Sequence, residues 1–258
     1  MVIVAMGDKV GSEMMLRLIS QLSRYGDYKV KSAIPLAIAL LNISNPNLST
    51  LHMLAKSTHE FDNFISITSM IALGLVSAGT NNAKYSQMMK QLKSTSAAQK
   101  DSVISYVLNQ SLGLCYLGKG SMTLSPLMHD NRILKLTSLG SIVSFAIMAL
   151  NHDDYIHGKQ NYMWHLLAPA IRCKFLNTYN SETLEKQPIK VRVGAPVDTV
   201  SHAGKQRRVT GFQTHSTPVA ISADERAEIV SDEISALTPF IEGNVVIECS
   251  GVEKMEIE

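Results

Sequence analysis

A six-residue block of small and apolar residues recurs along the chain and constrains the fold more than any other feature. GLVSAG begins at Gly74, and GLCYLG begins at Gly113; each runs from one glycine to another five residues later. ALLNIS, from Ala39, has the same shape without the glycines, and AIMALN, from Ala146, keeps it more weakly. The starts at 39, 74, 113 and 146 are 35, 39 and 33 residues apart. Such self-similarity is typical of helical repeats that stack into an array.

The first glycine of each block predicts close packing between helices. A glycine inside a helix costs about 1 kcal/mol relative to alanine. Gly74 and Gly113 both stand inside apolar segments with helical periodicity. We therefore expect each of them to face a neighbouring helix that leaves no room for a side chain.

The second glycine of each block predicts the end of a helix. Gly79 stands where a left-handed residue commonly follows a helix, and Gly118 is its equivalent in the next block. Thr80, Asn81 and Asn82 come directly after Gly79. Their polar side chains are expected to cap the next helix.

Apolar residues at intervals of three and four predict helices around these blocks. The third repeat, residues 101–134, is expected to hold a second helix that opens at Ser125, with Pro126 at its first helical position. The second repeat covers residues 62–94. The other expected helices span residues 10–24, 30–42, 48–57, 65–79, 83–92, 103–112 and 136–150.

The pattern changes to short alternating segments near residue 175, which indicates β-strands separated by glycine and proline. The expected strands are residues 189–193, 197–200, 208–215, 218–221 and 244–248. We expect the helical array to occupy residues 1–170 and a β-rich domain to occupy residues 171–258. The polar stretch 177–187 is expected to be the first site of limited proteolysis.

Composition limits the functional classes. The 258 residues are 45% hydrophobic and 18% charged, with a net charge of +2, which argues against a general nucleic-acid binder. No run of 18 apolar residues exists, so no membrane span is expected. The cysteines are odd in number and widely spaced, which suits a reducing compartment: Cys115, Cys173 and Cys249.

The start of the chain is apolar, with Val2, Ile3, Val4 and Met6 close together. An array cut between repeats exposes the face that a neighbouring repeat would cover. We therefore expect the array to continue upstream in the natural protein. We also expect the isolated chain to self-associate at micromolar concentration, which sedimentation would test.

Several long segments resemble one family. They are GSEMMLR (11–17), IPLAIALLNISNPNL (34–48), GTNNA (79–83), LGKGSMTLSP (117–126), VRVG (191–194), HAGK (202–205) and TGFQTHSTPV (210–219). Together and in order they resemble the C-terminal part of the larger repeat-built non-ATPase scaffold subunits in the base of the 26S proteasome regulatory particle. The last ten residues, CSGVEKMEIE, do not follow the family's usual ending.

The resemblance implies a mainly α-helical fold, an α-α solenoid or toroid of proteasome/cyclosome repeats followed by a small β-rich domain. It implies a non-catalytic protein-binding scaffold without cofactor or metal, which supports the proteasomal ATPase ring during ubiquitin-dependent protein degradation. The family also docks ubiquitin-like-domain proteins, through repeats that have no counterpart in this sequence. The implied location is the cytoplasm and nucleus. A stand-alone α-solenoid adaptor that binds proteins is the alternative function.

One segment nearly spells a phosphate-binding loop. Residues 113–121, GLCYLGKGS, place Lys119 after two glycines that are five residues apart. Such a loop needs Ser or Thr directly after the lysine and a strand before the first glycine. Gly120 occupies the Ser/Thr position, and residues 103–112 have a helical pattern. We therefore expect repeat packing here rather than a nucleotide site.

Other candidate sites have structural explanations that we favour. His152, Asp153, Asp154 and His157 could form a metal site, but a solvated loop explains them as well. No local signature makes any of the cysteines a nucleophile. Trp164, with its aromatic neighbour Tyr162 and with His165, is expected to cover the junction between the two domains.

A basic turn is the one candidate partner contact. Lys205, Arg207 and Arg208 follow the Ala203-Gly204 pair. They form either a solvated hairpin tip or a contact with an acidic face of a partner, since loops on rigid scaffolds often carry binding.

Overall fold

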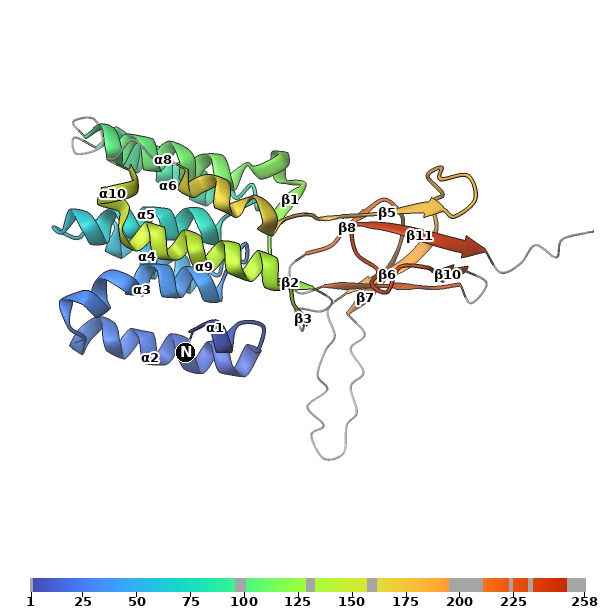
Figure 1. Ribbon diagram of the computed structural model, residues 1–258, viewed down its shortest axis with the longest axis horizontal. Helices are drawn as coiled ribbons and strands as arrows, with labels where there is room; N and C mark the ends of the chain where they lie inside the picture. The colour runs from blue at the N-terminus through green and yellow to red at the C-terminus, as the bar shows by residue number, and fades with distance from the viewer. Residues whose placement is uncertain are drawn as a thin grey trace, which may run out of the picture. The chain divides into compact units, whose positions relative to one another are not determined.

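The structure is a computed structural model that describes residues 2–95, 101–128, 133–156, 162–194, 211–222, 225–231 and 234–249. It has two compact units, Met1–Arg172 and Cys173–Glu258. The first is helical and the second is made of β-strands, so the predicted fold class is confirmed (Figure 1). Among the described residues, no helix has the length and apolar character that crossing a membrane requires.

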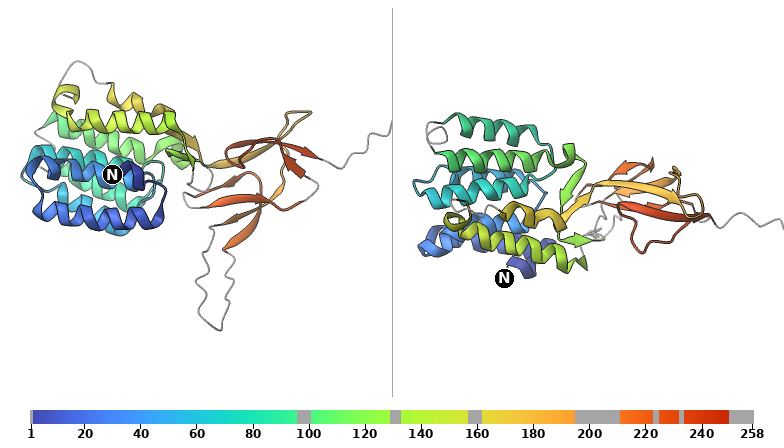
Figure 2. Two further views of the ribbon diagram at one scale, coloured as in Figure 1. Left: turned by 60° about the horizontal axis from the view of Figure 1, so that its bottom comes forward. Right: turned by 45° about the horizontal axis from the view of Figure 1, so that its top comes forward.

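The first unit is a layered array of helices. The helices α2, α3, α5 and α8 pack in that order, while α4 packs on α5 and α6 on α8 (Figures 1 and 2). The helices are α1 (Val2–Ala5), α2 (Lys9–Tyr25), α3 (Tyr28–Leu41), α4 (Leu48–Ser57), α5 (Asn63–Val76), α6 (Ala83–Ser94), α8 (Ser102–Cys115), α9 (Leu136–Leu150) and α10 (His152–Ile156), with short helices η1 (Leu117–Gly120) and η2 (Met163–Ala170).

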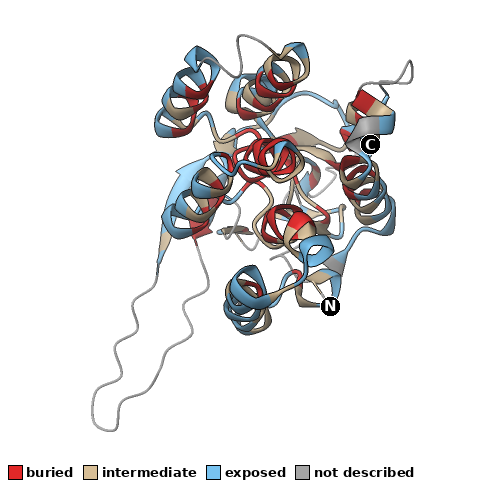
Figure 3. Ribbon diagram, turned by 90° about the vertical axis from the view of Figure 1, so that its left-hand side faces the viewer, coloured by how far each residue is buried: buried red, intermediate tan, exposed pale blue. Residues whose placement is uncertain are grey.

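Helix α5 forms the centre of this unit. Every residue from Ser66 to Val76 is buried, and α3, α4, α8 and α9 all pack against it. An end-on view shows buried residues gathered between the helices (Figure 3). A helix that is apolar on all sides must be covered on all sides. The buried hydroxyls of Thr68, Ser69 and Ser77 fit this surrounding because each donates to a carbonyl of its own helix.

The apolar residues near the start of the chain were expected to share one exposed face, and they do not. Val4 is 88% exposed and Ile3 is 38% exposed, but Met6 is 7% exposed and Val2 packs against the core. Met6 is buried in the turn that follows α1.

Helices α5 and α8 approach closely at Gly74. A Cβ atom on residue 74 would lie 2.9 Å from the Cβ and Oγ atoms of Ser111 on α8. The Ser111 hydroxyl donates to the Met70 carbonyl at 3.0 Å, and the Tyr85 hydroxyl of α6 donates to the Ser111 carbonyl at 3.2 Å. Three helices are therefore joined by buried hydrogen bonds around one glycine.

The expected close packing at Gly113 is wrong. No atom lies within 4 Å of the position of a Cβ on this residue, which is exposed. Ser111 and Cys115, four residues apart, share the buried face of α8, so residue 113 lies on the far side of the helix. The block recurs in sequence, but its first glycine has a packing role only in the second repeat.

We predict opposite effects of alanine at these two glycines. Gly74→Ala pushes a methyl group into Ser111 and should cost about 1–3 kcal/mol of unfolding free energy. Gly113→Ala meets open space and should stabilise the helix by about 0.5–1 kcal/mol. Urea unfolding of the two variants and the wild type measures both. Equal effects of the two substitutions would contradict the packing described here.

Tyr85 supplies a second test of the buried contact. Tyr85→Phe removes the hydrogen bond to Ser111 and should cost about 0.5–1.5 kcal/mol near neutral pH. Burial raises the pKa of the Tyr85 phenol. The unfolded phenol still ionises near its ordinary value of about 10, so the unfolded wild type loses a proton there that the folded state keeps.

The contribution of Tyr85 to the free energy of unfolding is thus fully present below about pH 10 and falls as the pH rises further. The stability difference between wild type and Tyr85→Phe should narrow between about pH 8 and about pH 11. Urea unfolding at the two pH values measures this difference. Tyr25→Phe is the matched control, because Tyr25 is 87% exposed and the control should change little at either pH. A constant Tyr85→Phe effect would count against the burial argument.

The expected helix at Ser125 is wrong. The chain there forms short strands instead, β1 (Met122–Leu124) and β2 (Leu127–Met128), and β2 pairs with β3 (Ile133–Leu134). The strand β1 pairs with β4 (Ile171–Cys173).

The amide of Ser125 donates to the Ala170 carbonyl at 3.0 Å, and the Ser125 hydroxyl binds Leu127 rather than capping a helix. An Arg172 Nη1 group also donates to the Leu127 carbonyl, and burial lowers the pKa of Arg172. Backbone pairing with β4 therefore replaces the second helix of this repeat.

The second unit contains two sheets that enclose one core. A four-stranded sheet has the order β10-β11-β5-β8, with β11 parallel to β5, and a three-stranded antiparallel sheet has the order β7-β6-β9. The core between them comprises Leu176, Ile189, Val191, Val193, Ala227, Val245 and Ile247. The strands are β5 (Phe175–Asn180), β6 (Lys190–Gly194), β7 (Phe212–Ser216), β8 (Val219–Ala220), β9 (Arg226–Ile229), β10 (Ile234–Ala236) and β11 (Asn244–Cys249).

A buried pair of threonines joins the two sheets. The hydroxyls of Thr178 on β5 and Thr217 after β7 are 2.6 Å apart, and Thr217 Oγ1 also accepts from the Ile189 amide at 3.0 Å. Residues 177–180, part of the stretch expected to be cleaved first in limited proteolysis, belong to the inner strand β5, and the order of cleavage stays a prediction. The polar residues there alternate with buried Leu176 and Thr178, a strand pattern that composition alone conceals. The expected strand at 197–200 lies outside the described residues.

Candidate functional site

The turns after the inner helices follow one backbone rule. The sixth residue of the first three blocks has a positive φ: +53° at Ser44, +65° at Gly79 and +56° at Gly118. In the fourth and weakest block, Asn151 has a φ of −112° and follows a different path. The left-handed conformation, rather than glycine itself, is what these three turns share.

Hydrogen bonds connect the first two of these turns to the next inner helix. The Ser44 amide donates to the Leu75 carbonyl at 3.1 Å, and the Gly79 amide donates to the Leu114 carbonyl at 2.8 Å. In both pairs the sixth residue of one block binds the second residue of the following block. The last carbonyls of a helix have no partner within the helix, so each turn satisfies an orphan group of its neighbour. The Asn81 amide adds a third bond of this kind, to Cys115, at 3.2 Å.

The three polar residues after Gly79 have different roles. Asn82 caps α6, and its Oδ1 atom accepts from the amides of Lys84 at 3.0 Å and Tyr85 at 3.5 Å. Asn81 instead has a left-handed backbone with a φ of +51°, and the Thr80 hydroxyl donates back to the Ser77 carbonyl. The expected capping by all three side chains is therefore correct only for Asn82, since only its side chain reaches the amides of α6.

Gly79 is required for a second reason. A Cβ atom on this residue would lie 1.8 Å from the carbonyl oxygen of Met122 on β1. The strand that replaces the expected helix thus presses its backbone against the turn of the preceding repeat. Only a residue without a side chain fits there.

This chain is similar in sequence to known subunits of the 26S proteasome. The family model described as the C-terminal region of 26S proteasome non-ATPase regulatory subunit RPN1 matches residues 200–250. The chain is 36% identical over 244 residues to 26S proteasome non-ATPase regulatory subunit 2 homolog A of Arabidopsis thaliana, covering 95% of this chain. It is 34% identical over 245 residues to 26S proteasome regulatory subunit rpn-1 of Neurospora crassa, and 34% over 244 residues to rpn1 of Schizosaccharomyces pombe. Each match again covers 95% of this chain.

The chain is homologous to the C-terminal portion of 26S proteasome non-ATPase regulatory subunit 2. It spans 27% of the length of each of these three relatives. The names of these relatives designate regulatory and non-ATPase subunits of the 26S proteasome.

The segment that resembles a phosphate loop has the geometry of a repeat turn. Helix α8 occupies the place where a phosphate loop needs a strand, and it includes Gly113. Gly118 and Lys119 both have left-handed backbones, and the Lys119 amide is already bound to the Tyr116 carbonyl at 2.7 Å. Lys119 is exposed. The segment thus forms the turn that follows α8.

The remaining candidates can now be placed in the fold or outside its described part. The basic turn of Lys205, Arg207 and Arg208 lies outside the described residues, as do His157 and the side chains of His152 and Asp153. Within the described ranges, no group of three or more His, Cys, Asp or Glu side chains could hold a metal ion. Cys115 is buried and Cys173 is exposed. Trp164 packs against Phe145 within the helical unit, with ring centroids 5.2 Å apart.

The sequence analysis missed a charged cluster on the three-stranded sheet. The guanidinium carbons of Arg192 and Arg226 lie 5.6 Å and 5.5 Å from the centre of the Phe212 ring. Arg226 also pairs with Glu228 at 2.7 Å. The alternation of charged and apolar residues from Lys190 to Val193 was a sequence signal for one half of the cluster. The pairing of β6 with β7 and β9 supplies the other half.

We predict that alanine at Gly79 will be far more harmful than alanine at Gly120. Both residues have positive φ, +65° and +85°, so each substitution pays a backbone cost of about 1–2 kcal/mol. Gly79→Ala adds a collision with the Met122 carbonyl, whereas the nearest atom to a Cβ on Gly120 is 3.3 Å away. Thermal unfolding and urea unfolding of both variants measure the difference. Similar losses for both would show that the strand does not press on the turn.

Proposed function

We propose that the chain acts as a non-catalytic scaffold in the base of the 26S proteasome regulatory particle. Homology to non-ATPase regulatory subunit 2 over 95% of the chain carries this proposal. In this scaffold role, the chain contacts proteasomal ATPase-ring subunits and other base subunits, and it works in the cytoplasm and nucleus. We assign the docking of ubiquitin-like-domain proteins to the part of the relatives that this sequence does not match.

The architecture supports a scaffold whose mechanism is geometric. The buried helix α5 and the bonds from Ser44 to Leu75 and from Gly79 to Leu114 fix the spacing of successive layers. A stack with fixed spacing presents its loops and outer faces at constant positions, and this is how helical repeat proteins bind partners. The same layers leave the outward face of α6 polar, with Lys84, Lys90 and Lys93 exposed.

We predict that the tagged chain, expressed in Schizosaccharomyces pombe, will capture proteasomal ATPase subunits. That organism carries a relative 34% identical to this chain. The measurement is quantitative mass spectrometry of the captured material in the presence of ATP. Gly79→Ala, which breaks the turn between repeats, should reduce capture.

The stand-alone adaptor is the competing function, and the same experiment separates the two. Circular dichroism first establishes that the captured wild-type chain is folded. A folded chain that brings down other proteins reproducibly, but no proteasome subunit, would overturn the scaffold proposal.

A further inference from the structure

We propose that the outward face of the sheet β7-β6-β9 binds an extended acidic peptide segment of a protein partner. Lys190 and Arg192 would receive carboxylates from residues two apart in that segment. This inference goes beyond the scaffold function, because it names a surface and the chemistry of its partner.

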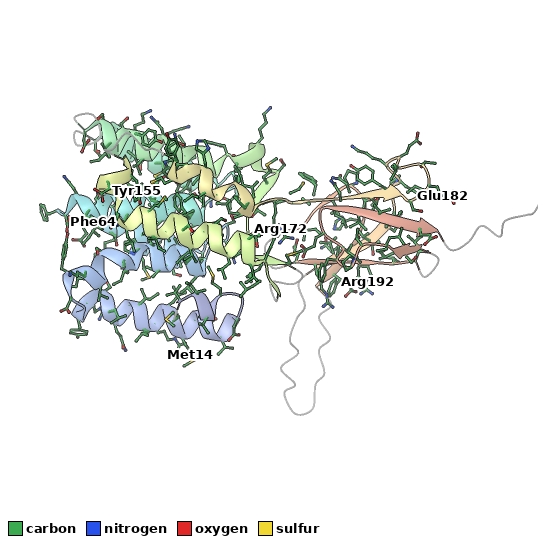
Figure 4. The ribbon with its side chains drawn as sticks, viewed as in Figure 1. Met14, Phe64, Tyr155, Arg172, Glu182 and Arg192 are labelled. Atoms are coloured by element: carbon green, nitrogen blue, oxygen red, sulfur yellow. The ribbon has the colours of Figure 1, made fainter. Side chains whose placement is uncertain are left out.

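Strand alternation creates this face. Val191 and Val193 point into the core and are 0% and 6% exposed, so Lys190 and Arg192 on the same strand point outward and are exposed. Figure 4 labels Arg192 on this unit. In register, Arg192 lies opposite Thr214 on β7 and Glu228 on β9. The core thus closes the inner side of the sheet at β6 and β9, and the outward side carries these polar side chains.

Gly194 allows an aromatic ring to organise the arginines. It lies opposite Phe212 on one side and Arg226 on the other. A Cβ on Gly194 would lie 2.2 Å from the Gly211 carbonyl oxygen, so β7 crosses this position more closely than a side chain permits. The Phe212 ring then holds both Arg192 and Arg226 by cation–π contacts. A guanidinium that is already held in place loses less entropy when it binds a ligand.

Charge on this face is not balanced within the described residues. Glu228 lies opposite Arg192 in register, but its carboxylate pairs with Arg226 at 2.7 Å. No salt bridge connects Arg192 or Lys190 to a carboxylate in the described part of the chain. Among the described side chains of this face, three cations, Lys190, Arg192 and Arg226, accompany one anion, Glu228, a net charge of 3 − 1 = +2. The complement of this surface is an acidic ligand.

Spacing specifies the form of that ligand. Residues two apart on a strand are separated by about 6.6 Å, which is also the spacing of side chains on one face of an extended peptide. Acidic side chains at alternate positions can therefore meet Lys190 and Arg192 together. An arginine can bind a carboxylate through two parallel hydrogen bonds. The exposed hydroxyls of Thr214 and Ser216, on the adjacent edge strand, lie on the same face and can donate to further oxygens.

The same evidence disfavours single-stranded nucleic acid. Proteins that bind single strands on a sheet use open aromatic faces on which bases stack. The π system of Phe212 is already engaged by two guanidinium groups. An acidic peptide needs only the outward charges and no free ring.

The test uses the full chain and a fluorescein-labelled peptide with four glutamates at alternate positions. Fluorescence anisotropy at low salt measures the dissociation constant. Arg192→Gln and Lys190→Gln each remove one outward cation and should weaken binding about tenfold, since such contacts are charge-assisted. Phe212→Leu should weaken it severalfold by releasing the arginines. Arg17→Gln, on the exposed side of α2, removes the same charge elsewhere and should change nothing.

Two further probes complete the design. The same peptide with glutamines in place of glutamates should not bind, and added salt should weaken binding of the acidic peptide. The thermal midpoint of each variant checks folding. Equal effects of Arg17→Gln and Arg192→Gln, binding of the glutamine peptide, or tighter binding of an oligouridylate would each overturn the proposal. Capture of ATPase subunits is measured separately, so failure here leaves the scaffold function intact.

Discussion

The bond between the turn of one repeat and the helix end of the next is the constraint on which the helical unit depends. A helix ends with carbonyl groups that have no partner inside it, and burying them unsatisfied is costly. In this protein the Ser44 and Gly79 amides bind the Leu75 and Leu114 carbonyls, so each layer completes its neighbour. Burial of α5 then adds apolar contact on every side of that helix, and the backbone bonds set the register in which this contact is made.

Much of the fold could be predicted because periodicity reports which face of an element is buried. The inner helices, the change to β-structure and the capping role of Asn82 all follow from local pattern. The different fates of Gly74 and Gly113 could not be predicted. They stand at the same place in the block, yet only Gly74 faces Ser111, because helix rotation relative to a neighbour is set by tertiary packing.

Two other differences between the predicted and the observed structure also arise from tertiary packing. Ser125-Pro126 satisfies the local rules for a helix start, but the backbone of β4 offers β1 a partner that sequence near Ser125 does not reveal. The polar residues of β5 suggest a linker until β11 and β8 are found on either side of that strand. The Arg192–Phe212–Arg226 cluster likewise depends on strands that are distant in sequence, so the alternation around Arg192 could indicate only one half of it.

The strand β1 has a consequence for the order in which the helical unit folds. Contacts between consecutive helices of the array join residues a few tens of positions apart, whereas the Leu124 amide binds the Ser44 hydroxyl across 80 residues, and β1 must also find β4. The loss of chain entropy on closing a loop grows with its length, and non-local contacts slow folding. The inner helices are therefore expected to pack together before β1 docks against them. Since Gly79 lies against Met122, the docking of β1 also fixes the turn between the earlier layers.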